Sequence, residues 1–277
     1  MALQVLSRTV AGLAGGLTLA AAALVPAQAA DWSDASVSAR YSTKFAEPGI
    51  SEDIAKVIYT FGYVSGDKYG MNLFVGDILT SDSKDPEAGG GGGAQEFYGF
   101  YQRTFSLAKL GVGGLKTGFT KDVSLVGRVD LGTKNTGFAP RPRKLRVGAL
   151  AEIAVPQGFW DVGVELYKET NHNGITGKDV NFDATGVLTS AWAIPVGGVG
   201  TFGGFFDYVG KKGKDGFGGD TAAETLLRAT FLFDVMGPKS GIKAGVGYEY
   251  WKNKFGNPAS VPGSLAKSPL ILVEYHL

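Results

Sequence analysis

The most constraining feature of this sequence is an alternation of apolar and polar residues in runs as long as a membrane-spanning β-strand. Between residues 144 and 155, Leu145, Val147 and Ile153 fall on one face of a predicted strand. Arg146 and Glu152 fall on the other face. Because successive side chains of a strand point to opposite sides, this run has one apolar and one charged face.

About twelve such runs follow one another along the chain. They cover residues 34–45, 53–65, 70–80, 95–107, 121–134, 144–155, 159–170, 180–194, 200–210, 222–235, 241–253 and 267–277. After residue 30, no stretch supplies the roughly 18 consecutive apolar residues of a spanning helix. The lipid interior holds no water that could hydrogen-bond to unpaired backbone groups, so a membrane-spanning chain must form either helices or a closed β-barrel. Without spanning helices, the closed barrel remains.

The connections between the runs decide between a membrane barrel and a soluble β-sandwich, both of which show alternation. Short turns are predicted at 66–67, 156–158, 197–198 and 236–239, and longer loops at 46–52, 81–94, 135–143, 171–179, 211–221 and 254–266. Short periplasmic turns and long external loops are typical of outer-membrane barrels. We therefore expect an all-β fold, a transmembrane antiparallel up-and-down β-barrel of about twelve strands, formed by residues 30–277.

Residues 1–29 have the pattern of a secretory signal peptide. Arg8 is their only charged residue, an apolar segment follows it, and an A-x-A cleavage site ends at Ala29. Without Arg8, the 27 basic residues become 26 and balance the 26 acidic ones. A neutral chain lacks the excess of positive charge that nucleic acid binding needs. We expect export to the cell outer membrane and no nucleic acid partner.

The end of the chain indicates a partner in assembly. The last residues, PLILVEYHL, resemble the C-terminal signal that the bacterial barrel assembly machinery reads, with Tyr275 third from the end and Leu277 in place of the usual Phe. The 17 Phe and 11 Tyr cluster near predicted strand ends, as in the aromatic girdles of a barrel that contacts outer membrane lipid. The RPRK segment at 141–144 suits lipopolysaccharide phosphates, and an ordinary basic loop explains it equally well.

The sequence gives little support for a catalytic site or a metal site. The chain has two histidines, His172 in a predicted external loop and His276 near the opposite rim, so no Ser–His pair or two-His metal site is expected. Gly89–Gly93 lacks the Lys-Ser/Thr that completes a phosphate-binding loop and indicates a flexible external loop. We expect no enzymatic activity, no cofactor and no metal.

The predicted inner face carries the functional signal, because charges inside a barrel must meet water or one another. We predict that nine residues line the lumen and bind solute: Tyr101, Arg103, Arg128, Asp130, Glu165, Tyr167, Phe205, Asp207 and Trp251. Rings beside charges suit a ring-bearing polar solute. A salt-bridged, plugged interior fits the same residues. Asn72 and Asp77 have opposite parity, so both can face inward only if the strand contains a bulge.

Scattered segments are similar to the Tsx-type nucleoside-specific channel family of Gram-negative outer membranes. They are Trp32, Ser36-Val37, Tyr41, Lys44-Phe45, RTFSLAKL at 103–110, VGALAEIAVPQGFWDVGVELYKE at 147–169, Phe182-Asp183, Ile194-Pro195 and LILVEYHL at 270–277. The resemblance implies a monomeric barrel with a narrow channel for nucleosides, lined by aromatic pairs and ionisable residues. Gly99 and Tyr101 stand where that family is expected to carry carboxylates. We therefore expect a passive channel for small, nucleoside-like solutes; the alternative is a non-conducting structural or surface-interaction barrel.

Overall fold

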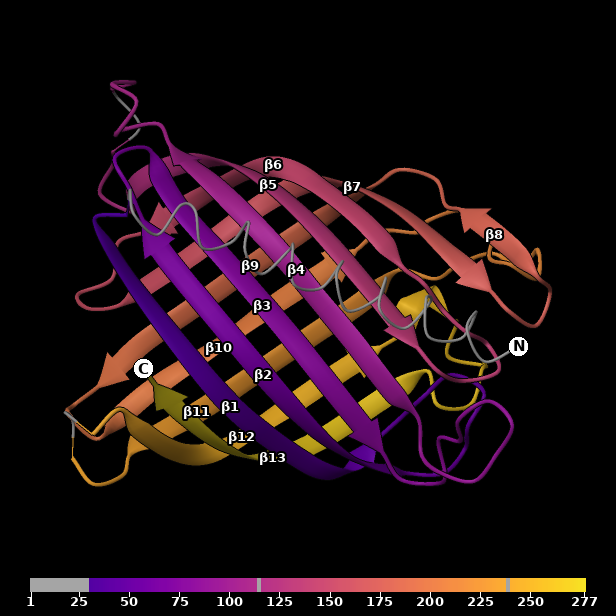
Figure 1. The fold of residues 1–277 in the computed structure, drawn as a ribbon. Helices are drawn as coiled ribbons and strands as arrows, with labels where there is room; N and C mark the ends of the chain where they lie inside the picture. Colours follow the sequence, from indigo (N-terminus) through magenta and orange to yellow (C-terminus); the bar gives the residue numbers. More distant parts are fainter. Residues whose placement is uncertain (1–29, 114–115, 238–239) are drawn as a thin grey trace, which may run out of the picture.

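The computed structural model describes residues 30–113, 116–237 and 240–277, so the expected signal peptide at 1–29 lies outside the described residues. Over these ranges the chain forms thirteen strands, twelve of which close into one antiparallel barrel (Figure 1). The strands are β1 (Trp32–Phe45), β2 (Ile54–Gly66), β3 (Gly70–Ser81), β4 (Gln95–Ser106), β5 (Thr120–Lys134), β6 (Arg143–Ile153), β7 (Phe159–Asn173), β8 (Lys178–Asn181), β9 (Thr185–Val196), β10 (Gly200–Val209), β11 (Glu224–Asp234), β12 (Ile242–Lys252) and β13 (Leu265–His276).

Each strand of the barrel pairs with its neighbours in sequence, and the ends of the sheet meet between β1 and β13, where Ser36 lies opposite His276. The short strand β8 is the exception, because it pairs only with β7 and extends beyond the barrel wall (Figure 1). β9 takes the next place in the wall by pairing with residues 159–167 of β7. The run predicted at 180–194 is thus divided between β8 and β9, and the predicted twelve-stranded barrel is confirmed over the described ranges.

The barrel has two distinct ends. The turn end carries the start of β1, the end of β13 and the connections at 67–69, 154–158 and 197–199. The loop end carries the connections at 46–53, 82–94, 135–142, 174–184, 210–223 and 253–264. The β4–β5 connection departs from the predicted rhythm, because it lies at the turn end although it spans residues 107–119, of which 114–115 are not described.

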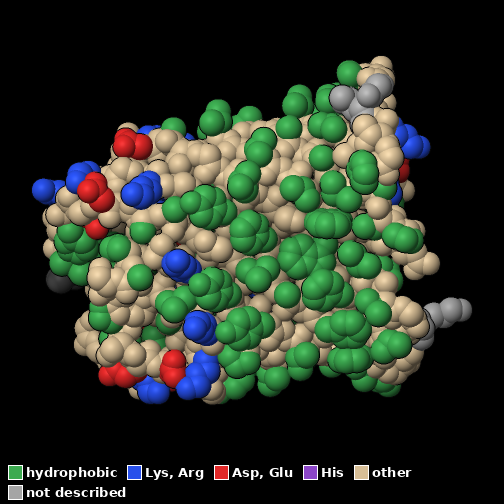
Figure 2. Space-filling view, turned by 180° about the vertical axis from the view of Figure 1, so that it is seen from behind, with side chains coloured by type: hydrophobic (Ala, Val, Ile, Leu, Met, Phe, Trp, Pro, Cys, Tyr) green, Lys and Arg blue, Asp and Glu red, His purple; other side chains and the backbone are tan. Residues whose placement is uncertain are grey.

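Apolar side chains cover the outer face of the wall. Ile78, Val129, Val164 and Ile271 are each at least half exposed. Figure 2 shows hydrophobic side chains spread over the wall, with most acidic and many basic residues gathered at the loop end, on the left of that view. Among the described residues, no helix is long and apolar enough to cross a membrane. Such a wall, charged inside and apolar outside, suits a lipid environment and reverses the pattern of a water-soluble barrel.

A hydrophobic core fills part of the barrel interior near the loop end. Phe45, Ile54, Ile58 and Leu270 are almost completely buried there. Phe45 reaches this core because an irregularity in the β1–β2 register lies between Ser42 and Phe45, and the extra residue turns the side chain inward. Each of these side chains contributes about 1.5–3 kcal/mol by its burial. Apolar contacts therefore help to stabilise this end of the barrel.

Candidate functional site

Ion pairs lie inside the barrel, and two groups of them are formed by residues of the strands themselves. The first, the Arg40 cluster, joins Arg40, Thr60, Asp77, Arg228 and Glu249 from five strands. Arg40 donates to Asp77 at 2.6 Å and to the Thr60 hydroxyl at 2.7 Å. The Arg228 guanidinium donates twice to one carboxylate oxygen of Glu249, at 2.8 and 2.6 Å. Each charge therefore has a partner, which offsets the cost of removing it from water.

The second group, the Arg146 cluster, lies mainly on β5, β6, β7 and β10 and contains Arg128, Asp130, Arg146, Glu165 and Asp207. Arg146 forms a bidentate pair with Asp207, at 2.9 and 3.0 Å, and also donates to Glu165. Its side chain reaches β10 past the two intervening strands β7 and β9. Arg128 pairs with Asp130 at 2.8 and 2.7 Å on its own strand. This cluster therefore links distant parts of the wall through the interior.

One member of most of these pairs remains accessible to water. The exposed fractions of the Asp77, Arg128, Asp207 and Arg228 side chains are 14, 16, 15 and 21 %. Their partners, Arg40, Asp130, Arg146 and Glu249, are no more than 7 % exposed. The accessible groups are thus two cations and two anions, each held in place by a buried opposite charge.

Aromatic rings lie against the two accessible arginines. The Arg128 guanidinium carbon is 3.7 Å from the ring centroid of Phe100, and that of Arg228 is 5.1 Å from the ring centroid of Phe205. A guanidinium over a ring face is stabilised by the ring quadrupole. Phe205 is among the residues predicted from the sequence, and Phe100 is not. Phe100 pairs directly with Asp130, so correct cross-strand parity would have found it.

The structure places seven of the nine predicted lumen residues on the inner face. They are Arg128, Asp130, Glu165, Tyr167, Phe205, Asp207 and Trp251. Tyr167 and Trp251 lie nearer the loop end than the charged clusters. The Tyr167 hydroxyl donates to Glu169 at 2.6 Å, and the Trp251 indole donates to Glu224 at 2.6 Å. Whether these residues bind solute stays a prediction.

The prediction that Tyr101 and Arg103 line the lumen is wrong, because both residues lie on the outer face of β4. Tyr101 is 41 % exposed and pairs with Val129, an outward residue. Arg103 donates to Asp67, in the β2–β3 turn, at 2.8 Å. The prediction assumed that an arginine in a spanning strand must face the lumen. Arg103 lies at the turn end, however, where a long side chain reaches beyond the apolar band to a carboxylate.

The parity conflict in β3 is resolved without a bulge. The β2–β3 and β3–β4 registers run continuously over the described residues of these strands. Asp77 faces inward to Arg40, whereas Asn72 lies on the outer face near the turn end. There the Asn72 carbonyl accepts a hydrogen bond of 2.6 Å from the Tyr101 hydroxyl.

A further set of buried charges, the Glu47 cluster, lies at the loop end. Glu47, from the β1–β2 loop, contacts Lys56, Lys134 at 3.4 Å and Lys254 at 3.0 Å. Asp85, from the β3–β4 loop, lies 2.8 Å from Lys134 and 3.2 Å from Lys56. None of the five side chains is more than 8 % exposed. Burial raises the pKa of Glu47, but the surrounding ammonium groups lower it further, to a net value below its ordinary range.

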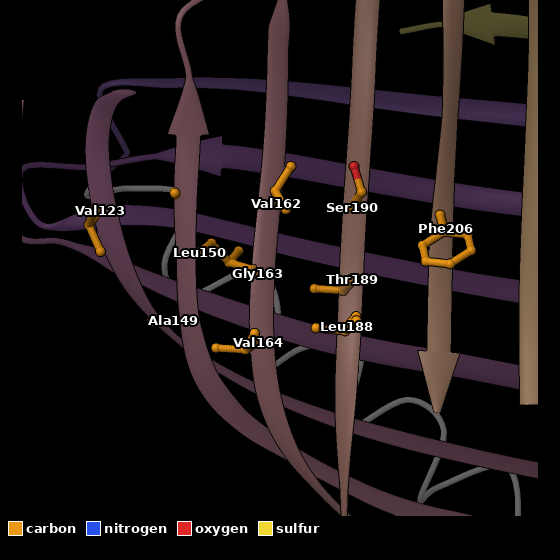
Figure 3. A pocket seen from close by; sticks show the side chains of 11 residues that line it. Val123, Ala149, Leu150, Val162, Gly163, Val164, Leu188, Thr189, Ser190 and Phe206 are labelled. Atoms are coloured by element: carbon orange, nitrogen blue, oxygen red, sulfur yellow. The ribbon is translucent and has the colours of Figure 1, made fainter. Parts of the chain in front are cut away.

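A hollow in the outer side of the wall is lined mainly by apolar side chains and is unsuited to a polar solute. It measures about 480 Å³, and Figure 3 shows it among side chains of β5, β6, β7, β9 and β10. Val162, Val164 and Leu188, which line it, are exposed on the outer face. Over the residues that the structure describes, no group of three or more His, Asp or Glu side chains could hold a metal ion. His172 pairs with Asp179 at the loop end, and His276 with Asp34 at the turn end.

Comparison with known proteins yields distant structural likeness only. No family model and no curated protein sequence matches this chain. Among solved structures, the translocator domain of the autotransporter NalP from Neisseria meningitidis is 10 % identical, with 96 % of this chain and 97 % of that one covered and a TM-score of 0.47. The β-domain of the Bordetella autotransporter BrkA is 10 % identical, covering 89 % and 99 %, with a TM-score of 0.41. OpdK from Pseudomonas aeruginosa is 9 % identical, covering 88 % and 98 %, with a TM-score of 0.29. These values carry no argument about function.

Proposed function

We propose that this protein is a monomeric outer-membrane channel for the passive entry of small polar solutes. The observation that carries the proposal is the pairing inside the barrel, where buried charges hold Asp77, Arg128, Asp207 and Arg228 in accessible positions. A solute that meets both signs of charge can exchange its water for weak, reversible contacts, as conduction requires. The apolar outer wall supports the membrane location.

For the solute, we propose nucleosides or similar ring-bearing molecules. Phe100 and Phe205 offer ring faces beside Arg128 and Arg228, so a base could stack while its polar edge and sugar meet charged groups. The segments that resemble Tsx-type channels support the same solute class. Tyr101 and Arg103 have no part in this proposal, because they lie outside the lumen.

The test is single-channel recording in planar bilayers with the purified protein. Nucleoside in the millimolar range should reduce the current through the wild-type channel. Arg128→Ala should shift the reversal potential in a salt gradient toward cation preference, and Asp207→Asn should shift it toward anion preference. Arg103→Ala is the matched control, an arginine on the outer face that should leave selectivity unchanged. Absence of current from the wild type and from every variant would remove the channel proposal.

A non-conducting structural barrel is the second candidate, and the buried groups near the loop end favour it. The Glu47 cluster and the core around Ile58 occupy the interior where a solute would enter. Glu47→Gln separates the two proposals. A channel whose loop end is narrowed by this cluster should conduct more after this substitution, whereas a structural barrel should conduct no current before or after it.

A further inference from the structure

Lys212 is a buried cation carried by an external loop. It lies in the β10–β11 connection, yet its side chain is only 2 % exposed. Its backbone N–H donates to the Thr221 hydroxyl at 2.7 Å, and its carbonyl accepts from the Asp183 N–H at 2.9 Å. The backbone is therefore anchored on both sides, and the side chain enters the barrel interior.

The ammonium group of Lys212 occupies a site made of one carboxylate and two rings. Nζ donates to Glu169 Oε2 at 2.5 Å, and the Tyr167 hydroxyl donates to the same oxygen at 2.6 Å. Nζ also lies 4.6 Å from the ring centroid of Phe182 and 5.8 Å from that of Tyr167. A carboxylate combined with ring faces is the arrangement by which proteins recognise ammonium ligands.

The same chemistry recurs at Lys254, which follows β12 at the loop end. Its Nζ lies 3.0 Å from Glu47 Oε1, 4.5 Å from the Trp251 ring centroid and 5.1 Å from that of Phe255. A buried lysine costs desolvation that a well-packed apolar residue of similar volume would avoid. Repetition of this costly arrangement indicates that the loop end of the interior is suited to ammonium groups.

The loop that carries Lys212 is largely exposed beyond that residue, at 214 and 217–220. Residues 214–218 and the β8 region line an open hollow of about 560 Å³, and the Lys214 side chain is 63 % exposed. The tip contacts a neighbouring loop through Phe217, whose ring centroid lies 6.4 Å from that of Phe138. Release of Lys212 from the interior would leave the ammonium position beside Glu169 empty.

We propose that Glu169, Tyr167 and Phe182 form a binding site for solutes that carry an alkylammonium group, and that Lys212 is its tethered occupant. A free amine binds by displacing the lysine head group and the loop with it. This site is separate from the channel proposal and does not require that the barrel conduct. Its ligand class differs from the neutral ring-bearing solutes discussed above.

Truncation of the tethered occupant tests the proposal in detergent-solubilised, folded protein. Lys212→Ala removes Cγ, Cδ, Cε and Nζ, which n-propylammonium replaces atom for atom. Isothermal titration should show that this variant binds n-propylammonium chloride roughly tenfold more tightly than Lys214→Ala, its control in the same loop. 1-Propanol should not bind, and adding Glu169→Gln should abolish amine binding. Equal amine affinity in the two lysine variants would overturn the proposal, as would binding of 1-propanol equal to that of the amine.

A measurement on the wild type keeps the proposal testable if Lys212→Ala fails to fold. Amide hydrogen exchange in residues 210–213 should accelerate with n-propylammonium chloride relative to sodium chloride of the same ionic strength. Exchange that is unchanged by the amine would overturn the proposal. Both readouts are independent of conductance, so their failure is distinct from failure of the channel proposal.

Discussion

Glu47→Gln should destabilise the folded barrel more than any exposed charge substitution. The Glu47 carboxylate contacts three buried lysines. Its removal leaves Asp85 in contact with Lys56 and Lys134 but takes away the carboxylate that Lys254 contacts. Loss of one partner from a buried ion pair costs about 3–5 kcal/mol, because the other charge stays buried without compensation. We expect the free energy of unfolding to fall by that amount.

The assay is urea unfolding in lipid vesicles, followed by tryptophan fluorescence. Asp53→Asn is the control from the same loop, because Asp53 pairs with Lys44 at 2.5 Å but both side chains are more than half exposed. Such a surface pair contributes less than about 1 kcal/mol. If Glu47→Gln cost no more than Asp53→Asn, charge pairing in the Glu47 cluster would not stabilise the barrel.

The same variant has a defined pH signature. The pKa of Glu47 is below its ordinary value of 4.5 in the folded protein. The unfolded chain therefore takes up a proton first as the pH falls, and the stability due to this carboxylate is present above pH 4.5 and lost below it. Wild-type stability should decline over this acid range, and Glu47→Gln should show a shallower decline. Parallel pH profiles would contradict the lowered pKa.

Three further outcomes are expected. The hydrogen bond from Arg103 lowers the pKa of Asp67 to about 2. This carboxylate should therefore contribute less than about 1 kcal/mol to stability, because the site is partly exposed, and the contribution should be lost as the pH falls from 3.8 to 2. In acid titrations of stability, Asp67→Asn should lack this loss. Ile58→Ala should cost about 2–5 kcal/mol in urea unfolding because it leaves a cavity in the core, whereas Ile78→Ala, on the outer face, should cost far less. Val164→Lys should reduce stability in vesicles by about 2–4 kcal/mol if Val164 faces the bilayer centre. Val164→Ala is the control and should change stability little. If lysine were tolerated as well as alanine, Val164 would not contact lipid.

The barrel wall was predicted from the alternation of apolar and polar residues along the sequence. The alternation in β6 and β7 predicts one apolar and one charged face because side-chain direction in a strand depends only on the parity of neighbouring residues. This rule, together with the expectation that charges face the lumen, placed Glu165, Asp207 and Arg128 on the inner face. The same rule failed at Tyr101 and Arg103, because parity orders the residues of a strand but does not say which parity faces inward.

Tertiary structure decided what fills the interior. Phe45 turns inward because of an irregularity in strand pairing, and Glu47 and Lys212 enter the barrel from loops whose paths depend on their contacts with distant strands. No local period encodes these positions, since each depends on partners far away in the chain. By itself the sequence determined a wall of alternating strands; the burial of charges near the loop end and the residues that remain accessible were set by packing and charge pairing across the barrel.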